Sequence, residues 1–261
     1  MDSDTDFRGV TGSALSLVSA TVEAVSPHGW VVMRVVFDPL ADIERALAEQ
    51  AGWTWFDDYL LYTCGVADLL ARGEIALIPH TATRVRIEPG EVGLAEGSVN
   101  WYTWRATGDG SWTRSRTTAV GPNPIVAAAQ LGNAVVNRTR RTQAAAAAQP
   151  RWVAERPGSV MISNRRLHLT NPDRSFSLHW SALESIDLTA PDRVGCRFPD
   201  RDGTLQQIQV QTPWAALLFV TAALQYFPHH PLLKNGTWLP AGFEDKCHLA
   251  GKKCPKVRTL G

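Results

Sequence analysis

The chain has 261 residues, of which 44% are hydrophobic and 20% charged, and a formal net charge of +1. This length accommodates one large or two ordinary domains, and the composition is that of a globular protein with a core. Neither half of the chain carries the strong positive excess that is typical of a surface tracking a nucleic-acid backbone. The longest apolar stretch, residues 214–224, is shorter than the roughly 20 residues that cross a bilayer, so no transmembrane segment is expected.

The first residues are acidic and lack the positive region and long apolar run of a secretory signal, so export by that route is not expected. Four cysteines in 261 residues are too few for a disulfide framework. These features predict a protein of the reducing cytoplasm.

Residues 1–120 are predicted to form an α+β domain with an antiparallel sheet. A valine-rich run at 30–37 is typical of a buried strand, and Asp38-Pro39 is a typical helix start that leads to a stop at Gly52. A second helix is predicted from Asp57 or Asp58 to Arg72, where helix capping is enough to explain the paired carboxylates. Strand-like runs with turns at Pro89-Gly90 and Asp109-Gly110 follow. These runs are residues 75–79, 83–94, 98–107 and 111–120.

Residues 121–150 are predicted to be a connecting helix, because Asn123-Pro124 opens an alanine-rich segment that Pro150 closes. Three arginines, Arg138, Arg140 and Arg141, lie toward its C-terminal end, where cations interact favourably with the helix dipole. A solvated face explains them, and contact with an anion or a nucleic acid is the alternative.

Trp101 and Trp104 are three positions apart in a predicted strand, so they face opposite sides and only one can lie in the core without a bulge. An exposed tryptophan there is a candidate binding surface. Because tryptophan is mostly buried, coverage of both by neighbouring helices is the favoured alternative.

Residues 151–228 alternate apolar and polar side chains in short runs and end in an apolar helix, which predicts a small β-barrel or sandwich plugged by that helix. The alternation changes phase at Ser163-Asn164-Arg165, as a tight turn or bulge produces. Asn164 suits such a turn because its side chain can bond local backbone. Arg165 lies in the turn and Arg166 opens the next strand, so both are expected to be solvated. An anion site is the second interpretation of this pair.

This region resembles bacterial PH-like and GRAM-like domains. The resemblance is carried by Gly158, Val160 to Ile162, Ser163-Asn164-Arg165-Arg166-Leu167, Phe176 to Trp180, Asp202-Gly203 and Pro213 to Phe227. It implies a PH-like β-barrel closed by a C-terminal helix and a binding or scaffold role. Residues 151–228 contain no lysine, so phosphoinositide binding is not expected, and recognition of a protein or peptide along a sheet edge or groove remains. The arginine preference and the alanine run at 144–148 resemble proteins of GC-rich actinobacteria.

Residues 229–261 are predicted to be a basic tail, since all five lysines follow residue 233. Cys247, His248 and Cys254 are candidate zinc ligands, although the six residues between the cysteines exceed the usual spacing of two to four. A disulfide between Cys247 and Cys254 is a further alternative, and a plain tail is preferred to both.

No nucleophile elbow, phosphate-binding loop, dinucleotide fingerprint or zinc-protease helix occurs in the sequence, which favours a non-enzymatic protein. The leading hypothesis is a binding or scaffold protein that recognises a protein partner, with Arg165, Arg166, Trp101 and Trp104 as candidate ligand-binding residues. One alternative is a nucleic-acid-associated factor that uses Arg138, Arg140, Arg141 and the lysines. Another is an enzyme with a site between domains, built from residues such as His28, Asp57 and His80.

Overall fold

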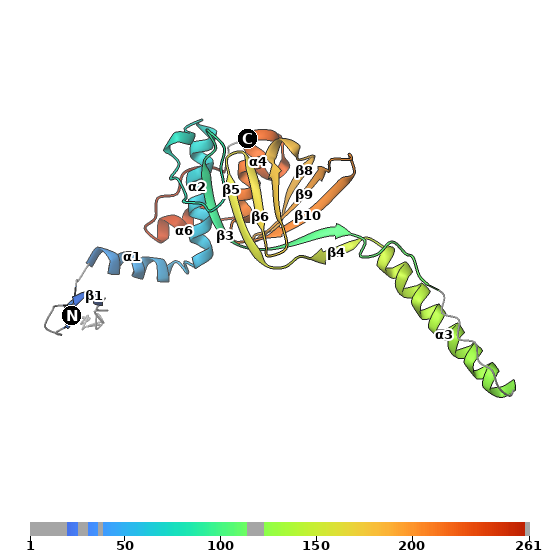
Figure 1. The fold of residues 1–261 in the computed structure, drawn as a ribbon. Coiled ribbons are helices and arrows are strands. Elements are labelled where there is room, and N and C mark those ends of the chain that lie inside the picture. The colour runs from blue at the N-terminus through green and yellow to red at the C-terminus, as the bar shows by residue number, and fades with distance from the viewer. Residues whose placement is uncertain (1–19, 26–30, 36–38, 114–122, 259–261) are drawn as a thin grey trace, which may run out of the picture. The chain divides into compact units, whose positions relative to one another are not determined.

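The structure, a computed structural model, describes residues 20–25, 31–35, 39–113 and 123–258, with side chains for 40–113 and 134–258 (Figure 1). Its contacts divide the chain into two units. The smaller unit comprises Met1–Trp53 and Asp245–Lys253, and the larger comprises Thr54–Glu244 and Cys254–Gly261. Among the described residues, no helix is long and apolar enough to cross a membrane.

The smaller unit contains a hairpin and a helix. Strands β1 (Ala20–Val25) and β2 (Val31–Val35) pair antiparallel, and helix α1 (Pro39–Gln50) follows. The predicted strand and helix are confirmed, and β1 is an element that the sequence analysis missed. Gly52 ends the helix with a φ of 62°, a left-handed conformation that glycine adopts without strain.

The larger unit is organised by one antiparallel sheet of eight strands in the order β7-β6-β5-β3-β10-β9-β8, with β4 paired to β3 off this path. The strands are β3 (Gly93–Arg105), β4 (Arg151–Ala154), β5 (Gly158–Ser163), β6 (Arg166–Thr170), β7 (Ser175–His179), β8 (Ser185–Ala190), β9 (Arg193–Pro199) and β10 (Leu205–Gln211). Different parts of strand β3 pair with different strands. Its residues 93–99 pair with β5, and its residues 100–103 pair with β10.

The predicted α+β class with an antiparallel sheet is confirmed, but two finer predictions are wrong. The sheet is open, with β7 and β8 at its ends, so it is not a closed barrel. The chain does not form separate domains before and after residue 120, because β3 lies in the middle of the sheet formed by the later strands. Pairing between distant segments brings about this arrangement, and local periodicity carries no information on it.

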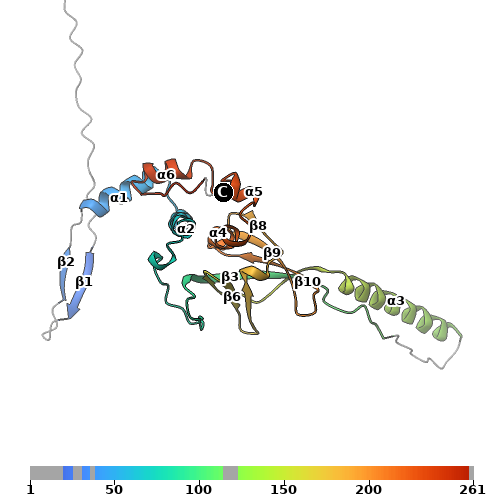
Figure 2. The same cartoon turned by 90° about the horizontal axis from the view of Figure 1, so that it is seen from above.

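Helices α2 (Trp55–Ala71) and α4 (Ala215–Tyr226) pack against each other beside the sheet, and α4 contacts β8 and β9 (Figures 1 and 2). Helix α2 starts two or three residues before the predicted Asp57 or Asp58, with Thr54 and Asp57 forming a capping box. Helix α4 is apolar on all sides and is buried from Ala215 to Ala223, so it fills the core.

The segment between α2 and β3 contains fewer strands than predicted. Residues 75–79 include a short 3-10 helix, η1 (Ile75–Leu77), because a short apolar run does not distinguish helix from strand. The turn at Pro89-Gly90 is present, with the Glu91 N–H donating to the Glu88 carbonyl at 2.9 Å. Residues 111–113 form no strand, and 114–120 lie outside the described residues.

The connecting helix is confirmed as α3 (Asn123–Ala148), which joins β3 to β4. At its C-terminal end the Ala147 carbonyl accepts the N–H groups of Thr107 and Gly108, at 2.9 and 3.0 Å. These bonds tie the helix end to the turn that follows β3.

The predicted basic tail is wrong, since the C-terminal segment folds. It contains α5 (Pro231–Lys234) and α6 (Phe243–Leu249). In the larger unit, the buried side chains of this segment are Leu233, Trp238, Leu239, Phe243 and Val257. Arg258 donates to Glu244 at 3.2 Å and to the carbonyls of Gly236 and Pro240 at 3.1 and 2.9 Å. The apolar residues have irregular spacing, so the sequence shows no period that would reveal the packing.

Candidate functional site

Strand β8 ends the sheet on one side, and among the described strands its partner is β9 alone. Beside it is a hollow of about 280 Å³, which we call the apolar hollow. The lining comes from α2, β8, α4 and the segment after α5. The lining residues are Phe56, Leu60, Leu188, Ala190, Pro191, Ala216, Thr237, Trp238 and Pro240.

The lining of the apolar hollow contains no charged side chain. Two of its lining residues, Leu60 and Trp238, are only 3% and 2% exposed and belong to the core. Its volume lies just below the roughly 300–1,000 Å³ of pockets that hold whole small molecules, and it has room for an apolar side chain of a larger partner.

A second hollow, also of about 280 Å³, lies at the turn that joins β8 to β9, and we call it the polar hollow. Its lining residues are Trp55, Ser98, Val99, Asn100, Pro157, Gly158, Asp192, Gln211, Thr212 and Pro213. Asp192 directly follows Pro191 of the apolar hollow, and Trp55 directly precedes Phe56. The linings of the two hollows therefore meet at the β8–β9 turn and at the first turn of α2.

Hydrogen bonds fix the wall of the polar hollow around Asp192. Its carboxylate accepts the Gln211 side-chain amide at 2.8 Å, and its carbonyl accepts the Thr212 N–H at 2.9 Å. The Thr212 hydroxyl donates to the Ser98 carbonyl of β3 at 3.0 Å. Asp192 is the one charged residue in this lining, so the polar hollow carries a negative charge.

The tight turn predicted at residues 163–165 is confirmed, and a buried ionic cluster stabilises it. Arg166 donates two hydrogen bonds to Glu91, at 2.9 and 2.7 Å, and the Ser163 hydroxyl donates a third at 2.6 Å. The Glu91 side chain is completely buried, and that of Arg166 is 12% exposed. Asn164 bonds the distant Val92 N–H at 2.8 Å rather than local backbone. We call Glu91, Ser163, Arg166 and His168 the Glu91 cluster.

Electrostatics within this cluster favour a charged Glu91. Burial raises the pKa of the Glu91 carboxyl, but the hydrogen bonds from Arg166 and Ser163 outweigh it and lower the pKa to about 2. Burial, together with the charge of Arg166, lowers the pKa of His168. The His168 Nδ1 lies 2.7 Å from the Ser177 hydroxyl, which holds the ring in place.

These contacts test the expectation that Arg165 and Arg166 are both solvated. It is confirmed for Arg165, whose side chain is 46% exposed, and wrong for Arg166, whose guanidinium pairs with Glu91 and lies 3.0 Å from Glu88. Arg166 is largely buried because the β5–β6 turn packs against the segment that contains Glu88 and Glu91. The sequence of the hairpin alone does not show this contact. Because its guanidinium is already paired with carboxylates, Arg166 is not available to bind an external anion.

Of the two candidate tryptophans, Trp101 is 2% exposed and Trp104 is 39% exposed, so only one lies in the core, as the strand spacing requires. The alternative in which both are covered is wrong. Trp104 packs on Trp152 of β4, with ring centroids 5.3 Å apart. This contact between neighbouring strands covers part of the Trp104 side chain.

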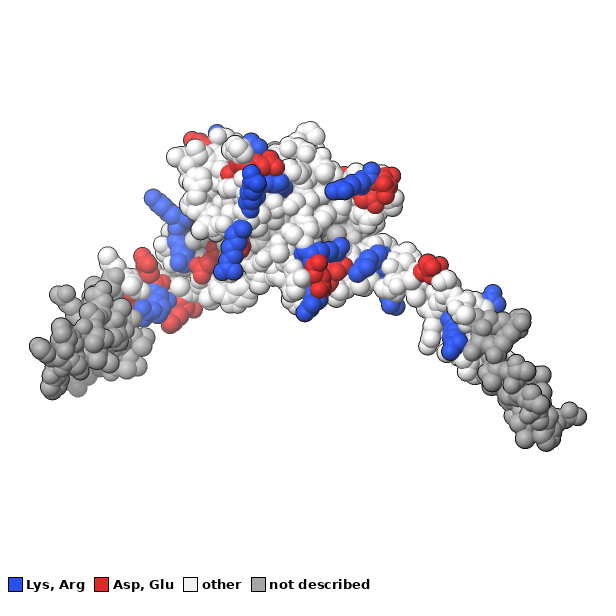
Figure 3. Space-filling view, viewed as in Figure 1, with Lys and Arg blue, Asp and Glu red and all other residues white. Residues whose placement is uncertain are grey.

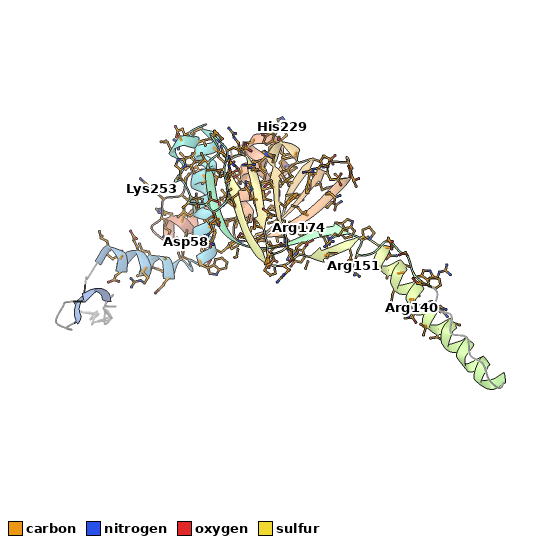
Figure 4. All side chains as sticks on the ribbon, in the orientation of Figure 1. Asp58, Arg140, Arg151, Arg174, His229 and Lys253 are labelled. Atoms are coloured by element: carbon orange, nitrogen blue, oxygen red, sulfur yellow. The ribbon has the colours of Figure 1, made fainter. Side chains whose placement is uncertain are left out.

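The remaining predicted residues lie elsewhere. Arg138, Arg140 and Arg141 are exposed on α3, as a solvated face requires; Figure 4 labels Arg140 on this helix. Cys247 is buried, His248 is exposed and Cys254 is part-buried; none of the four cysteines is in a disulfide. Within the described ranges, no group of three or more His, Cys, Asp or Glu is placed to hold a metal ion.

Two residues of the enzyme hypothesis, Asp57 and His80, lie in the described part of the chain. Asp57 accepts the Thr54 N–H and hydroxyl at 2.6 and 2.7 Å, which is a capping role. His80 is exposed in the segment after η1, and His28 lies outside the described residues.

The sequence analysis did not find the two hollows. Their walls come from segments that are remote in sequence, and each segment taken alone has an ordinary apolar or turn composition. The exposure of Trp55 at the start of α2 is visible only in the structure. Comparison of the sequence with protein-family models and with curated proteins gave no match, so the functional argument rests on this geometry.

Proposed function

We propose that the protein is a non-enzymatic binding protein that recognises an extended segment of a protein partner along β8. The observation that carries the proposal is the terminal strand β8 lying beside the apolar hollow. A segment added to a sheet edge gains main-chain hydrogen bonds from the strand and specificity from pockets that take alternate side chains.

The alternation of apolar and polar side chains along β8 fits the binding of an extended segment. Ile186 is buried, while Leu188 and Ala190 are half-buried and line the apolar hollow. Asp187 and Thr189 alternate with them and are exposed. A bound strand would alternate in the same way, so every second side chain would face α2 and α4.

We also propose a PH-like character for the larger unit. In its support, strands β5 to β10 and the apolar helix α4 follow one another in the order that the resemblance implies. The chain departs from the expected pattern in three respects: the sheet is open rather than a closed barrel, β3 comes from before residue 151, and α3 separates β3 from β4.

The charge pattern favours a protein partner over an anionic lipid surface or a nucleic acid. Arg105 and Arg174 both pair with Glu155, at 3.2 and 2.9 Å, and Arg156 pairs with Asp173 at 3.1 Å. On the face drawn in Figure 3, several blue side chains of the larger unit lie beside red ones. Arginines paired with carboxylates contribute little to a phosphate-binding surface.

We place this activity in the cytoplasm, which is supported by four cysteines that form no disulfide. The rival function, contact with nucleic acid through Arg138, Arg140 and Arg141, is tested by titrating random duplex DNA at about 50 mM salt, where phosphate contacts are strong. We expect no binding.

The direct test is selection of a phage-displayed library of random peptides on the immobilised full chain. We expect enriched peptides with an apolar anchor, and we expect Ala190→Arg to abolish their binding because it places a charge in the apolar hollow. Ser175→Arg, on the exposed surface of β7 at the opposite end of the sheet, is the matched control and should bind normally. Failure to enrich any peptide, or equal binding by both variants, would overturn the proposal.

A further inference from the structure

The structure assigns a chemistry to the partner segment: we propose that it carries a lysine or arginine next to its apolar anchor, and that the polar hollow binds this cation. The inference rests on the proposed function, since the same segment is bound at the apolar hollow. It names the class of ligand that the neighbouring hollow selects.

Continuity of the walls supports simultaneous binding at the two hollows. Pro191 and Asp192 are consecutive residues, as are Trp55 and Phe56, and in each pair one residue lines each hollow. Because the two linings meet at these two places, a segment anchored in the apolar hollow can continue past the β8–β9 turn to the polar hollow.

Charge complementarity identifies the occupant of the polar hollow. Asp192 is its one charged lining residue, and an ionised carboxylate has acceptor sites beyond the one used by Gln211 at 2.8 Å. Arg193, the next residue in the chain, does not line the hollow. A cationic side chain therefore meets an opposite charge, whereas an acidic side chain would be repelled.

The part of the polar hollow that Trp55 forms also suits a cation. Trp55 is 66% exposed although it opens a helix whose other face is buried. Its indole meets Phe56 and Tyr59 edge-on, with centroids 5.9 and 5.7 Å apart, which holds the ring in position. A lysine or arginine over an exposed tryptophan face is attracted by the ring quadrupole. Carboxylate and indole together form a site for the head and stem of a basic side chain.

The experiment uses the peptides enriched on the full chain, made synthetically and titrated by fluorescence anisotropy. We expect a Lys or Arg near the apolar anchor in their sequences. Replacing that Arg by citrulline, or that Lys by norleucine, should weaken binding to the wild-type protein about tenfold, the size of one charge-assisted hydrogen bond. Asp192→Asn should weaken binding of the basic peptide by a similar factor and leave binding of the neutral peptide unchanged.

Trp55→Ala should also weaken binding of the basic peptide more than binding of the neutral one, and Trp55→Phe should restore part of the difference between the two affinities. Equal binding of basic and neutral peptides to the wild-type protein would overturn this inference and leave the proposed function standing. Absence of any enriched peptide would overturn the proposed function itself. Because the comparison of peptides uses the wild-type chain, it holds even where a variant folds poorly.

Discussion

The guanidinium of Arg166 and the carboxylate of Glu91 are joined by two hydrogen bonds, of 2.9 and 2.7 Å, across 75 positions of sequence. They fasten the β5–β6 turn to the segment that leads into β3. Removing the cation alone leaves a buried carboxylate without its partner, so Arg166→Met should lower the free energy of unfolding by about 3–5 kcal/mol. Urea denaturation followed by tryptophan fluorescence measures this.

Two variants control that measurement. Arg165→Met, at a side chain that is 46% exposed, should cost less than about 1 kcal/mol. The double variant Glu91→Leu with Arg166→Met should be more stable than Arg166→Met alone, because no charge remains buried. Equal losses for Arg165→Met and Arg166→Met would show that the pair does not stabilise the fold.

The same cluster should make stability depend on pH. The pKa of Glu91 is lowered from 4.5 to about 2, so its contribution is complete above the ordinary value and is lost as the pH falls from 4.5 toward 2. Over that window the free energy of unfolding should fall by roughly 3 kcal/mol through this group. Urea midpoints at several pH values measure the slope, and Glu91→Gln should flatten it. An unchanged slope in Glu91→Gln would contradict the assignment.

The folded C-terminal segment gives a separate test. Trp238 is 2% exposed, so Trp238→Ala should lower the free energy of unfolding by about 3–5 kcal/mol. Trp104→Ala, at a residue 39% exposed and packed on Trp152, should cost only about 0.5–1.5 kcal/mol. A flexible tail would give almost no loss for Trp238→Ala.

Thiol reactivity should separate the cysteines. Cys64, Cys196 and Cys247 are at most 1% exposed, and burial raises the pKa of Cys196 to about 12. Cys254 is part-buried and should be the one thiol per chain that reacts quickly with a thiol reagent near pH 8, because the others are shielded. All four should react in denaturant. Loss of two thiols in the unreduced, denatured protein would instead indicate the disulfide between Cys247 and Cys254.

Local elements of this protein could be read from the sequence because their causes act within a few residues. Gly52 ends α1, Thr54 and Asp57 cap α2, and the phase change at 163–165 predicts the turn between β5 and β6. The apolar run that became α4 was recognised as a buried helix for the same reason. These features depend on backbone preference and on periodicity, which neighbouring residues determine.

The tertiary structure alone decided which distant segments meet. It placed β3 between β5 and β10, which turned two expected domains into one open sheet. It brought Glu91 to Arg166, and so made a buried ion pair of an arginine that the local pattern left in solvent. It also set Trp55 and Phe56 beside the β8–β9 turn, where the two hollows form. Pairing and packing of remote segments follow from the whole arrangement of apolar surface and hydrogen bonds, and a short sequence window contains none of that information.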